Sequence, residues 1–78
     1  MKTLIVTYGG LVRFLVTNHP DYRFGKLQSQ MPVDIILFGV TDCKAKDIKL
    51  RFADRQLPNS EWYRVDETFE QFLSNLVG

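Results

Sequence analysis

Residues 2–17 read KTLIVTYGGLVRFLVT, and this stretch decides the fold of the chain. Two runs rich in β-branched and aromatic residues, 2–8 and 11–17, lie on either side of Gly9-Gly10. Such residues favour β-strands, and two adjacent glycines supply the positive φ angles of a two-residue hairpin loop. The stretch therefore predicts an antiparallel β-hairpin.

The residues after the hairpin predict a helix and then a further strand. Asn18 or His19 is suited to be the N-cap of a helix over residues 20–29, with Pro20 in its first turn. The most apolar run of the chain, residues 33–40, reads VDIILFGV. Because it carries almost no polar alternation, it predicts a central strand covered on both faces.

Two more helices and a short extended segment are expected in the second half. Thr41-Asp42 is a cap signal before a helix over residues 43–56, and residues 61–65 (EWYRV) indicate an edge strand or an extended segment. The apolar positions of the 43–56 helix share one face by their spacing, and they are Ala45, Ile48, Phe52 and Ala53. The last helix is expected to begin after a cap at Asp66 and to end at a glycine cap, Gly78, and its apolar stripe comprises Phe69, Phe72, Leu73, Leu76 and Val77.

Together these elements follow the order β-β-α-β-α-(β)-α. The sequence therefore predicts one α+β domain over residues 1–78, with a small three-stranded antiparallel sheet flanked by helices.

The charges divide the second half of the chain into a basic and an acidic part, although the whole chain has a net charge of only +1. Residues 44–55 carry five basic and two acidic side chains, whereas residues 59–78 carry Arg64 against four acidic side chains. Two solvated helix faces would explain this pattern. A polarity of this kind also leaves open a homodimer formed by head-to-tail self-association.

The single cysteine, Cys43, excludes an intrachain disulfide and is typical of a reducing cytoplasm. No apolar run approaches the roughly 18 residues of a membrane-spanning helix. We therefore expect a cytoplasmic protein with no membrane partner.

Two short motifs give the sequence a family resemblance. Pro20 to Pro32 reads P-x-x-R-x-x-x-L-Q-x-x-x-P, and Phe52 to Tyr63 reads F-A-D-R-x-x-x-x-x-E-W-Y. With the hairpin before them and the apolar strand between them, they resemble the short phage and bacterial branch of the GIY-YIG endonuclease superfamily over roughly residues 4–65. The resemblance implies a GIY-YIG-like fold.

The same resemblance implies a catalytic set, and this sequence departs from it. Members of the family cut a phosphodiester with one divalent metal ion, a tyrosine, an arginine and a metal-binding glutamate. Arg23 matches the arginine, and Tyr8 lies near the expected tyrosine but is displaced. The glutamate position is Ala45 here, and the nearest acid, Asp47, points to another face of the helix. The sequence therefore predicts no metal ligand, and Mg²⁺ or Mn²⁺ would be needed only if Tyr8, Arg23 and Asp47 formed an active site.

Three functions remain open at this stage. The first is a non-catalytic, nuclease-like binding module for nucleic acid or a nucleoprotein complex, without a cofactor. The second is a small phage or mobile-element protein that binds and inhibits a host nucleic-acid-processing machine, and the third is an active metal-dependent endonuclease. The binding module would have Arg23 and the 43–56 helix at one shared cleft, and its expected phosphate-binding residues are Arg13, Arg23, Lys26, Lys49, Arg51 and Arg55.

Overall fold

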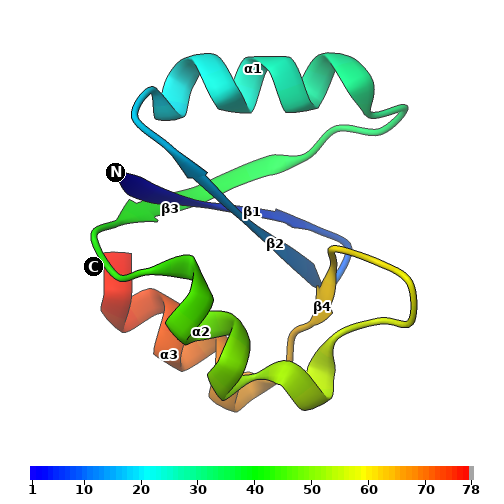
Figure 1. Ribbon diagram of the computed structural model, residues 1–78. Helices are drawn as coiled ribbons and strands as arrows, with labels where there is room; N and C mark the ends of the chain where they lie inside the picture. Colours follow the sequence, from blue (N-terminus) through cyan, green and yellow to red (C-terminus); the bar gives the residue numbers. More distant parts are fainter. Residues whose placement is uncertain (78) are drawn as a thin grey trace.

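The computed structural model describes residues 1–77 and contains a four-stranded sheet with helices on both faces (Figure 1). The elements follow in the order β1 (Lys2–Tyr8), β2 (Leu11–Thr17), α1 (Pro20–Gln30), β3 (Ile36–Thr41), α2 (Ala45–Arg51), the 3₁₀ turn η1 (Ala53–Arg55), β4 (Tyr63–Arg64) and α3 (Glu67–Val77). The α+β class expected from the sequence is confirmed. No helix in residues 1–77 has both the length and the apolar character needed to cross a bilayer.

The predicted hairpin is confirmed. β1 and β2 pair antiparallel from Lys2↔Thr17 to Tyr8↔Leu11. Gly9 and Gly10 form the turn with φ angles of 53° and 80°. Both angles lie in the left-handed region, as a type I′ turn requires, and glycine adopts this region without steric cost.

The sheet has four strands, not the three expected, in the order β3-β1-β2-β4. The fourth strand is the 61–65 segment, of which only Tyr63 and Arg64 pair, with Val12 and Leu11. All pairings are antiparallel. The rest of β2 therefore has β1 on one side and no strand on the other.

The prediction that residues 33–40 form a central strand buried on both sides is wrong. β3 begins only at Ile36 and lies at the edge of the sheet, paired with β1 alone. Ile36 and Leu37 keep 63% and 39% of their surface exposed. The central place belongs to β1, because its hairpin partner covers one edge and β3 the other.

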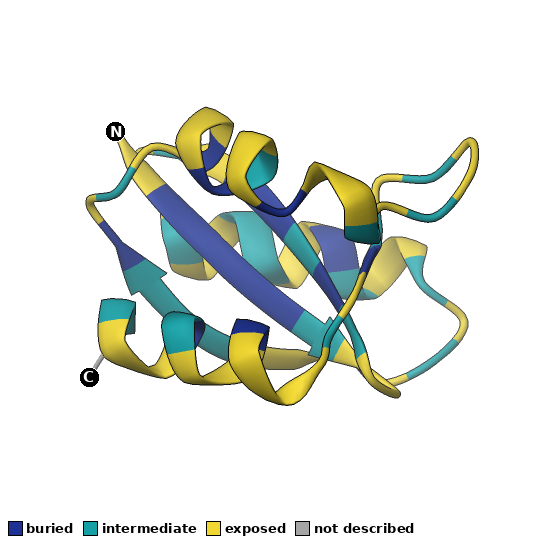
Figure 2. Ribbon diagram, turned by 90° about the horizontal axis from the view of Figure 1, so that it is seen from below, coloured by how far each residue is buried: buried dark blue, intermediate teal, exposed yellow. Residues whose placement is uncertain are grey.

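Each face of the sheet has its own apolar core. α1 covers one face, and α2 and α3 cover the other (Figures 1 and 2). The core under α1 contains Leu4, Val6, Leu15, Leu27 and Ile35. The core under α2 and α3 contains Ile5, Val12, Phe14, Ala45, Ile48, Phe52, Tyr63, Phe69 and Leu73.

β1 supplies residues to both cores because successive side chains of a strand point to opposite faces. Leu4 and Val6 lie in the core under α1, and Ile5 lies in the other. All three side chains have no exposed surface. In Figure 2 this strand is dark blue along most of its length, between helices whose outer sides are yellow.

The three predicted helices exist, but the second is shorter than expected. α1 follows the prediction closely, although His19 makes no side-chain capping hydrogen bond. α2 starts at Ala45 instead of residue 43, because the Thr41 hydroxyl accepts the Cys43 N–H 3.2 Å away and holds a turn there. α2 ends at Arg51, and the chain continues as η1, so that Ala53 is exposed and not part of the apolar face.

The predicted cap of α3 is confirmed. The Asp66 carboxylate accepts the Phe69 N–H at 2.8 Å, which satisfies a free donor of the first turn. Phe69 and Leu73 are buried on the inner side of the helix, and the other apolar positions of the stripe are half-buried. The glycine cap expected at Gly78 lies outside the described residues.

Gly39 permits α3 to pack against the edge strand. A Cβ atom at this position would lie 2.6 Å from Val77 Cγ1 and 2.7 Å from Val77 Cβ. The same stretch carries a bulge, because Ile5 pairs with Gly39 while Val6 pairs with Leu37. The absent side chain at residue 39 therefore sets how closely the C-terminal end of α3 approaches the sheet.

We expect Gly39→Ala to lower the free energy of unfolding by about 1–3 kcal/mol, because the added methyl group would force α3 away from β3. Urea denaturation followed by circular dichroism measures the effect.

Gly25→Ala is the matched control. Gly25 lies in α1 with open space around the position of a Cβ atom, so alanine should raise stability by about 0.5–1 kcal/mol through its helix propensity. Equal effects of the two substitutions would contradict the role assigned to Gly39.

Candidate nucleic-acid interface

The sheet separates the basic residues expected to share one surface. Arg23 and Lys26 belong to α1, while Lys49 and Arg51 belong to α2 and Arg55 to η1. α1 and α2 lie on opposite faces of the sheet (Figure 1). The expectation that Arg23 and the second helix frame one cleft is therefore wrong.

The residues of the hypothetical active site do not meet either. Tyr8 lies at the end of β1 beside the hairpin turn, Arg23 lies on α1, and Asp47 is exposed on α2, across the sheet from Arg23. Within residues 1–77, no three His, Cys, Asp or Glu side chains come together in a group that could hold a metal ion. Ala45, at the glutamate position of the resembled family, is 3% exposed and packs in the core under α2.

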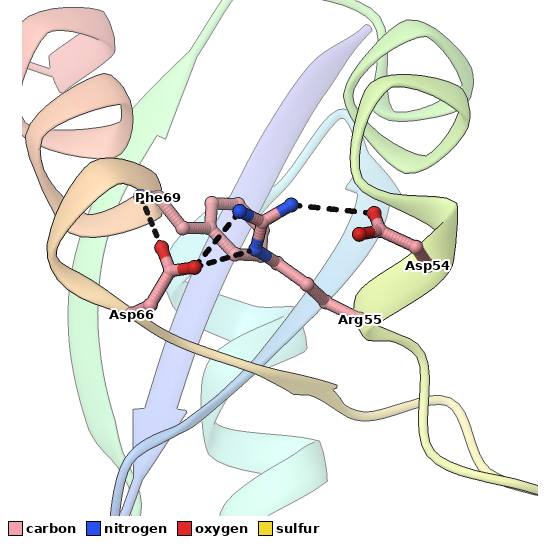
Figure 3. A network of polar contacts seen from close by, with 4 residues as sticks. All are labelled: Asp54, Arg55, Asp66 and Phe69. Carbon is pink, nitrogen blue, oxygen red and sulfur yellow. Dashed lines mark hydrogen bonds and ion pairs between the residues drawn. The ribbon is translucent and has the colours of Figure 1, made fainter.

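Arg55 is held in an internal network (Figure 3). Its Nε and Nη2 donate to Asp66 Oδ2 at 3.0 and 2.8 Å, and its Nη1 donates to Asp54 at 3.2 Å. The guanidinium also lies 5.0 Å from the centre of the Phe52 ring and 5.9 Å from that of Phe69. These contacts join η1 to the start of α3, so a phosphate group would have to compete with two carboxylates for this side chain.

Arg51 is also occupied within the fold. Its guanidinium lies over the Phe72 ring, 4.8 Å from the ring centre, and 5.8 Å from the centre of the Phe52 ring. Cation–π contacts of this kind bring α2 and α3 together on the outer side of their shared core. Of the basic residues expected on this side of the sheet, Lys49 is the one with neither an ion pair nor an aromatic contact among residues 1–77.

A groove runs along α2, beside the open part of β2 and past the start of β1, and we call it the α2 groove. It consists of two adjoining hollows of about 490 and 360 Å³ that share Val16, Ala45 and Lys46. The first is also lined by Lys49, Leu50, Ala53, Gln56 and Tyr63, and the second by Met1, Thr3, Asp42 and Lys44.

The α2 groove is cationic. Lys44, Lys46 and Lys49 form no ion pair with residues 1–77, whereas the one carboxylate lining the groove, Asp42, is bonded to Lys2. Burial, together with the nearby Glu61 carboxylate, raises the pKa of the Tyr63 phenol above its ordinary value of 10.0, so this side chain adds no negative charge to the groove. The groove thus presents positive charge, and among the described residues that line it no carboxylate is unpaired.

Lys46 is a groove residue that the sequence-based set lacked. The signal was present, because Lys46 and Lys49 are three residues apart and side chains at this spacing share one side of a helix. Asp47 and Arg51 lie on another side of the helix and do not line the groove. The position of a charged residue around α2 therefore decides whether its side chain lines the groove.

Arg13 occupies an unusual place on the other face of the sheet. It alternates with Phe14, which points to α2 and α3, and so it lies on the α1 side together with Leu15. Its Nε atom is buried and has no hydrogen-bond partner among the described residues. Such a group is destabilising by about 1–3 kcal/mol compared with a satisfied one.

No protein-family model, curated protein or solved structure matches the chain. The structure alone therefore supports the choice of site.

Asp66 makes part of the protein's free energy of unfolding depend on pH in the acid range. The Phe69 N–H and then the Arg55 guanidinium lower the pKa of this carboxyl below its ordinary value of 3.8. Its stabilising effect is therefore fully present above the unfolded-state pKa and is lost as the pH falls through the folded-state value. We expect Asp66→Asn to be less stable than the native chain at pH 7 and to lose less of its remaining stability between pH 5 and pH 2, as measured by urea midpoints across this range.

Glu67→Gln serves as the control, because Glu67 is exposed in the same turn and takes part in no ion pair among the described residues. If the two variants showed the same pH dependence of stability, Asp66 would not be the source of the pH-dependent part.

Arg13→Met should raise the free energy of unfolding by up to about 1 kcal/mol, since methionine keeps the apolar stem and removes the unsatisfied nitrogen. Thermal unfolding measures this directly, with Arg64→Met, an exposed site on β4, as the control. A loss of stability in Arg13→Met would contradict the destabilising role assigned to the Nε atom.

Proposed function

We propose that this protein is a non-catalytic binding module for nucleic acid that holds a phosphate backbone along the α2 groove. The observation that carries the proposal is the pair Lys46 and Lys49, which line one hollow and have no carboxylate partner among the described residues. Lysine side chains in such a position displace counterions from phosphates and give an affinity that depends on salt.

The shape of the groove agrees with an extended ligand. The two hollows extend from Lys44, at the N-cap of α2, past the helix to Gln56 after η1, so that a chain of phosphates would meet Lys44, Lys46 and Lys49 in succession. A net charge of +1 supplies little long-range attraction. We therefore propose a modest affinity that depends on these local contacts.

A relation to the GIY-YIG endonucleases is also proposed, and the succession of hairpin, arginine-bearing helix, strand and second helix supports it. In this proposal the scaffold is kept without the metal-dependent reaction, because the position of the metal-binding glutamate is Ala45. Binding should then need no divalent ion.

The proposed binding is tested by fluorescence anisotropy with a labelled oligonucleotide at several salt concentrations. The logarithm of affinity should fall with the logarithm of salt by about 0.9 per phosphate contact for a duplex, so removal of two lysines in Lys46→Ala/Lys49→Ala should reduce the slope by about 2. Chelation with EDTA should leave the affinity unchanged.

Lys26→Ala is the matched control, because Lys26 is an exposed cation on α1, across the sheet from the groove. A slope that changes equally in both variants, or no salt-dependent binding at all, would contradict the proposal. Nicking of plasmid with Mg²⁺ or Mn²⁺ that is lost in Arg23→Ala and Asp47→Ala would instead support the active endonuclease.

A second candidate function is the inhibition of a host nucleic-acid-processing machine through the binding of a protein segment, which the lysines of the groove would select for acidic side chains. The observation that favours it is the open edge of β2 after Val12, next to the exposed side chains of Val16 and Leu50. An extended peptide could add to this edge as a further strand. Val16→Ser/Leu50→Ser should weaken such a partner strongly and a nucleic acid only slightly, and the two cases can thus be told apart.

A further inference from the structure

We propose that a hollow between the hairpin turn and α3, which we call the turn hollow, binds a small amphipathic amine, with the apolar part of the ligand inside and its ammonium group at Glu70. The turn hollow has a volume of about 280 Å³ and also borders the start of β3. None of the described residues that line it lines the α2 groove. The inference is therefore independent of the proposed nucleic-acid binding.

Two glycines leave the space of the turn hollow open. Gly9 and Gly10 line it, and apart from their chain neighbours no heavy atom lies within 4 Å of the place that a Cβ atom of either would take. Their positive φ angles favour glycine, so the turn sends no side chain into the hollow. Most ligand pockets have volumes of roughly 300–1,000 Å³, so a hollow of this size is suited to a small ligand.

The wall of the turn hollow is largely apolar. Ile36 and Phe38 line it from β3, Leu73 lines it from α3, and Val65 lines it from the segment between β4 and α3. Leu73 is buried and Phe38 is half-buried, whereas Ile36 keeps 63% of its surface exposed. A ligand that covers this apolar surface removes it from water, which is favourable. The wall therefore selects an aliphatic or aromatic group.

Among the described residues that line the turn hollow, one carboxylate decides the charge of the ligand. Glu70 lies three residues before Leu73 on α3, a spacing that places both side chains on the same side of the helix. Within residues 1–77 the Glu70 carboxylate forms no ion pair. Thr7 contributes a hydroxyl group, which can accept a hydrogen bond from an ammonium group. An ammonium ligand would thus find an anion and a neutral acceptor.

The charges around Glu70 also favour a cation. Residues 59–78 carry four acidic side chains and one basic side chain, that of Arg64. Tyr63 points into the core under α2 and α3, so Arg64, the next residue of β4, points to the α1 side of the sheet. A ligand carboxylate would be repelled by Glu70, whereas an ammonium group would pair with it. Because an exposed ion pair adds little, we expect a Kd on the order of 1 mM for a ligand of this size.

The test is a titration of the isotope-labelled whole chain with phenethylamine, followed by the NMR shifts of its backbone amides. The amides around the turn hollow, those of Gly9, Gly10, Val65 and Glu70, should shift together and saturate. Two matched compounds should each bind about tenfold more weakly. One is 3-phenylpropanoate, which carries a carboxylate in place of the ammonium group, and the other is ethylamine, which lacks the ring.

Glu70→Gln should weaken phenethylamine binding about threefold, because it removes the charge and keeps the shape of the side chain. Glu67→Gln is its control, since Glu67 is exposed in the same turn of α3 and does not line the turn hollow. Ile36→Ala should also weaken binding, because it removes part of the apolar wall. Its control is Leu37→Ala, at the next residue, which points to the opposite face of β3. Ile36 and Leu37 are both exposed, so neither substitution should disturb the fold.

Three results would overturn the proposal: no amide shifts at the turn hollow, equal binding of 3-phenylpropanoate and phenethylamine, or equal effects of Glu70→Gln and Glu67→Gln. Tighter binding of Nα-acetyl-lysine amide than of phenethylamine would overturn it too, because the hollow would then suit a lysine side chain of a protein partner. None of these outcomes bears on oligonucleotide binding by Lys46 and Lys49.

Discussion

The complete burial of β1 between two helical layers is the constraint on which the rest of this structure depends. Leu4, Ile5 and Val6 have no exposed surface, and they alternate between the core under α1 and the core under α2 and α3. A small domain can bury only a limited part of its surface, so one strand that serves two cores is an efficient arrangement. It also means that residues on α1 and residues on α2 cannot share a site, because β1 and its neighbours lie between them.

This separation determines which chemistry the molecule can carry out. The family resemblance suggested a tyrosine, an arginine and an acid around one phosphate, but Arg23 and Asp47 lie on opposite sides of the sheet. What remains on the α2 side is a groove whose described lining carries positive charge and no unpaired carboxylate. Such a groove is suited to hold a polyanion, and this is the basis of the proposed function.

The basic residues of the 44–55 segment have different roles although they are close in sequence. Arg55 connects η1 to the capping residue of α3, and Arg51 lies over the Phe72 ring of α3. Both arginines therefore hold the second helical layer together, and their planar guanidinium groups are suited to carboxylate and ring contacts. The lysines, on the side of α2 that faces β2, are left for a ligand.

The sequence by itself determined the local elements and their order. The Gly9-Gly10 turn, the start of α1 at Pro20 and the cap at Asp66 depend on φ preferences and hydrogen bonds within a few residues, so they could be predicted. Only the tertiary structure decided that the apolar run at residues 33–40 becomes an edge strand, because strand order depends on which edge of β1 is still free once the hairpin has formed. The site was decided at the same level: Lys46 and Lys49 belong to the groove and Arg55 does not, since helix position and partners distant in sequence, such as Asp66, determine which charges remain free.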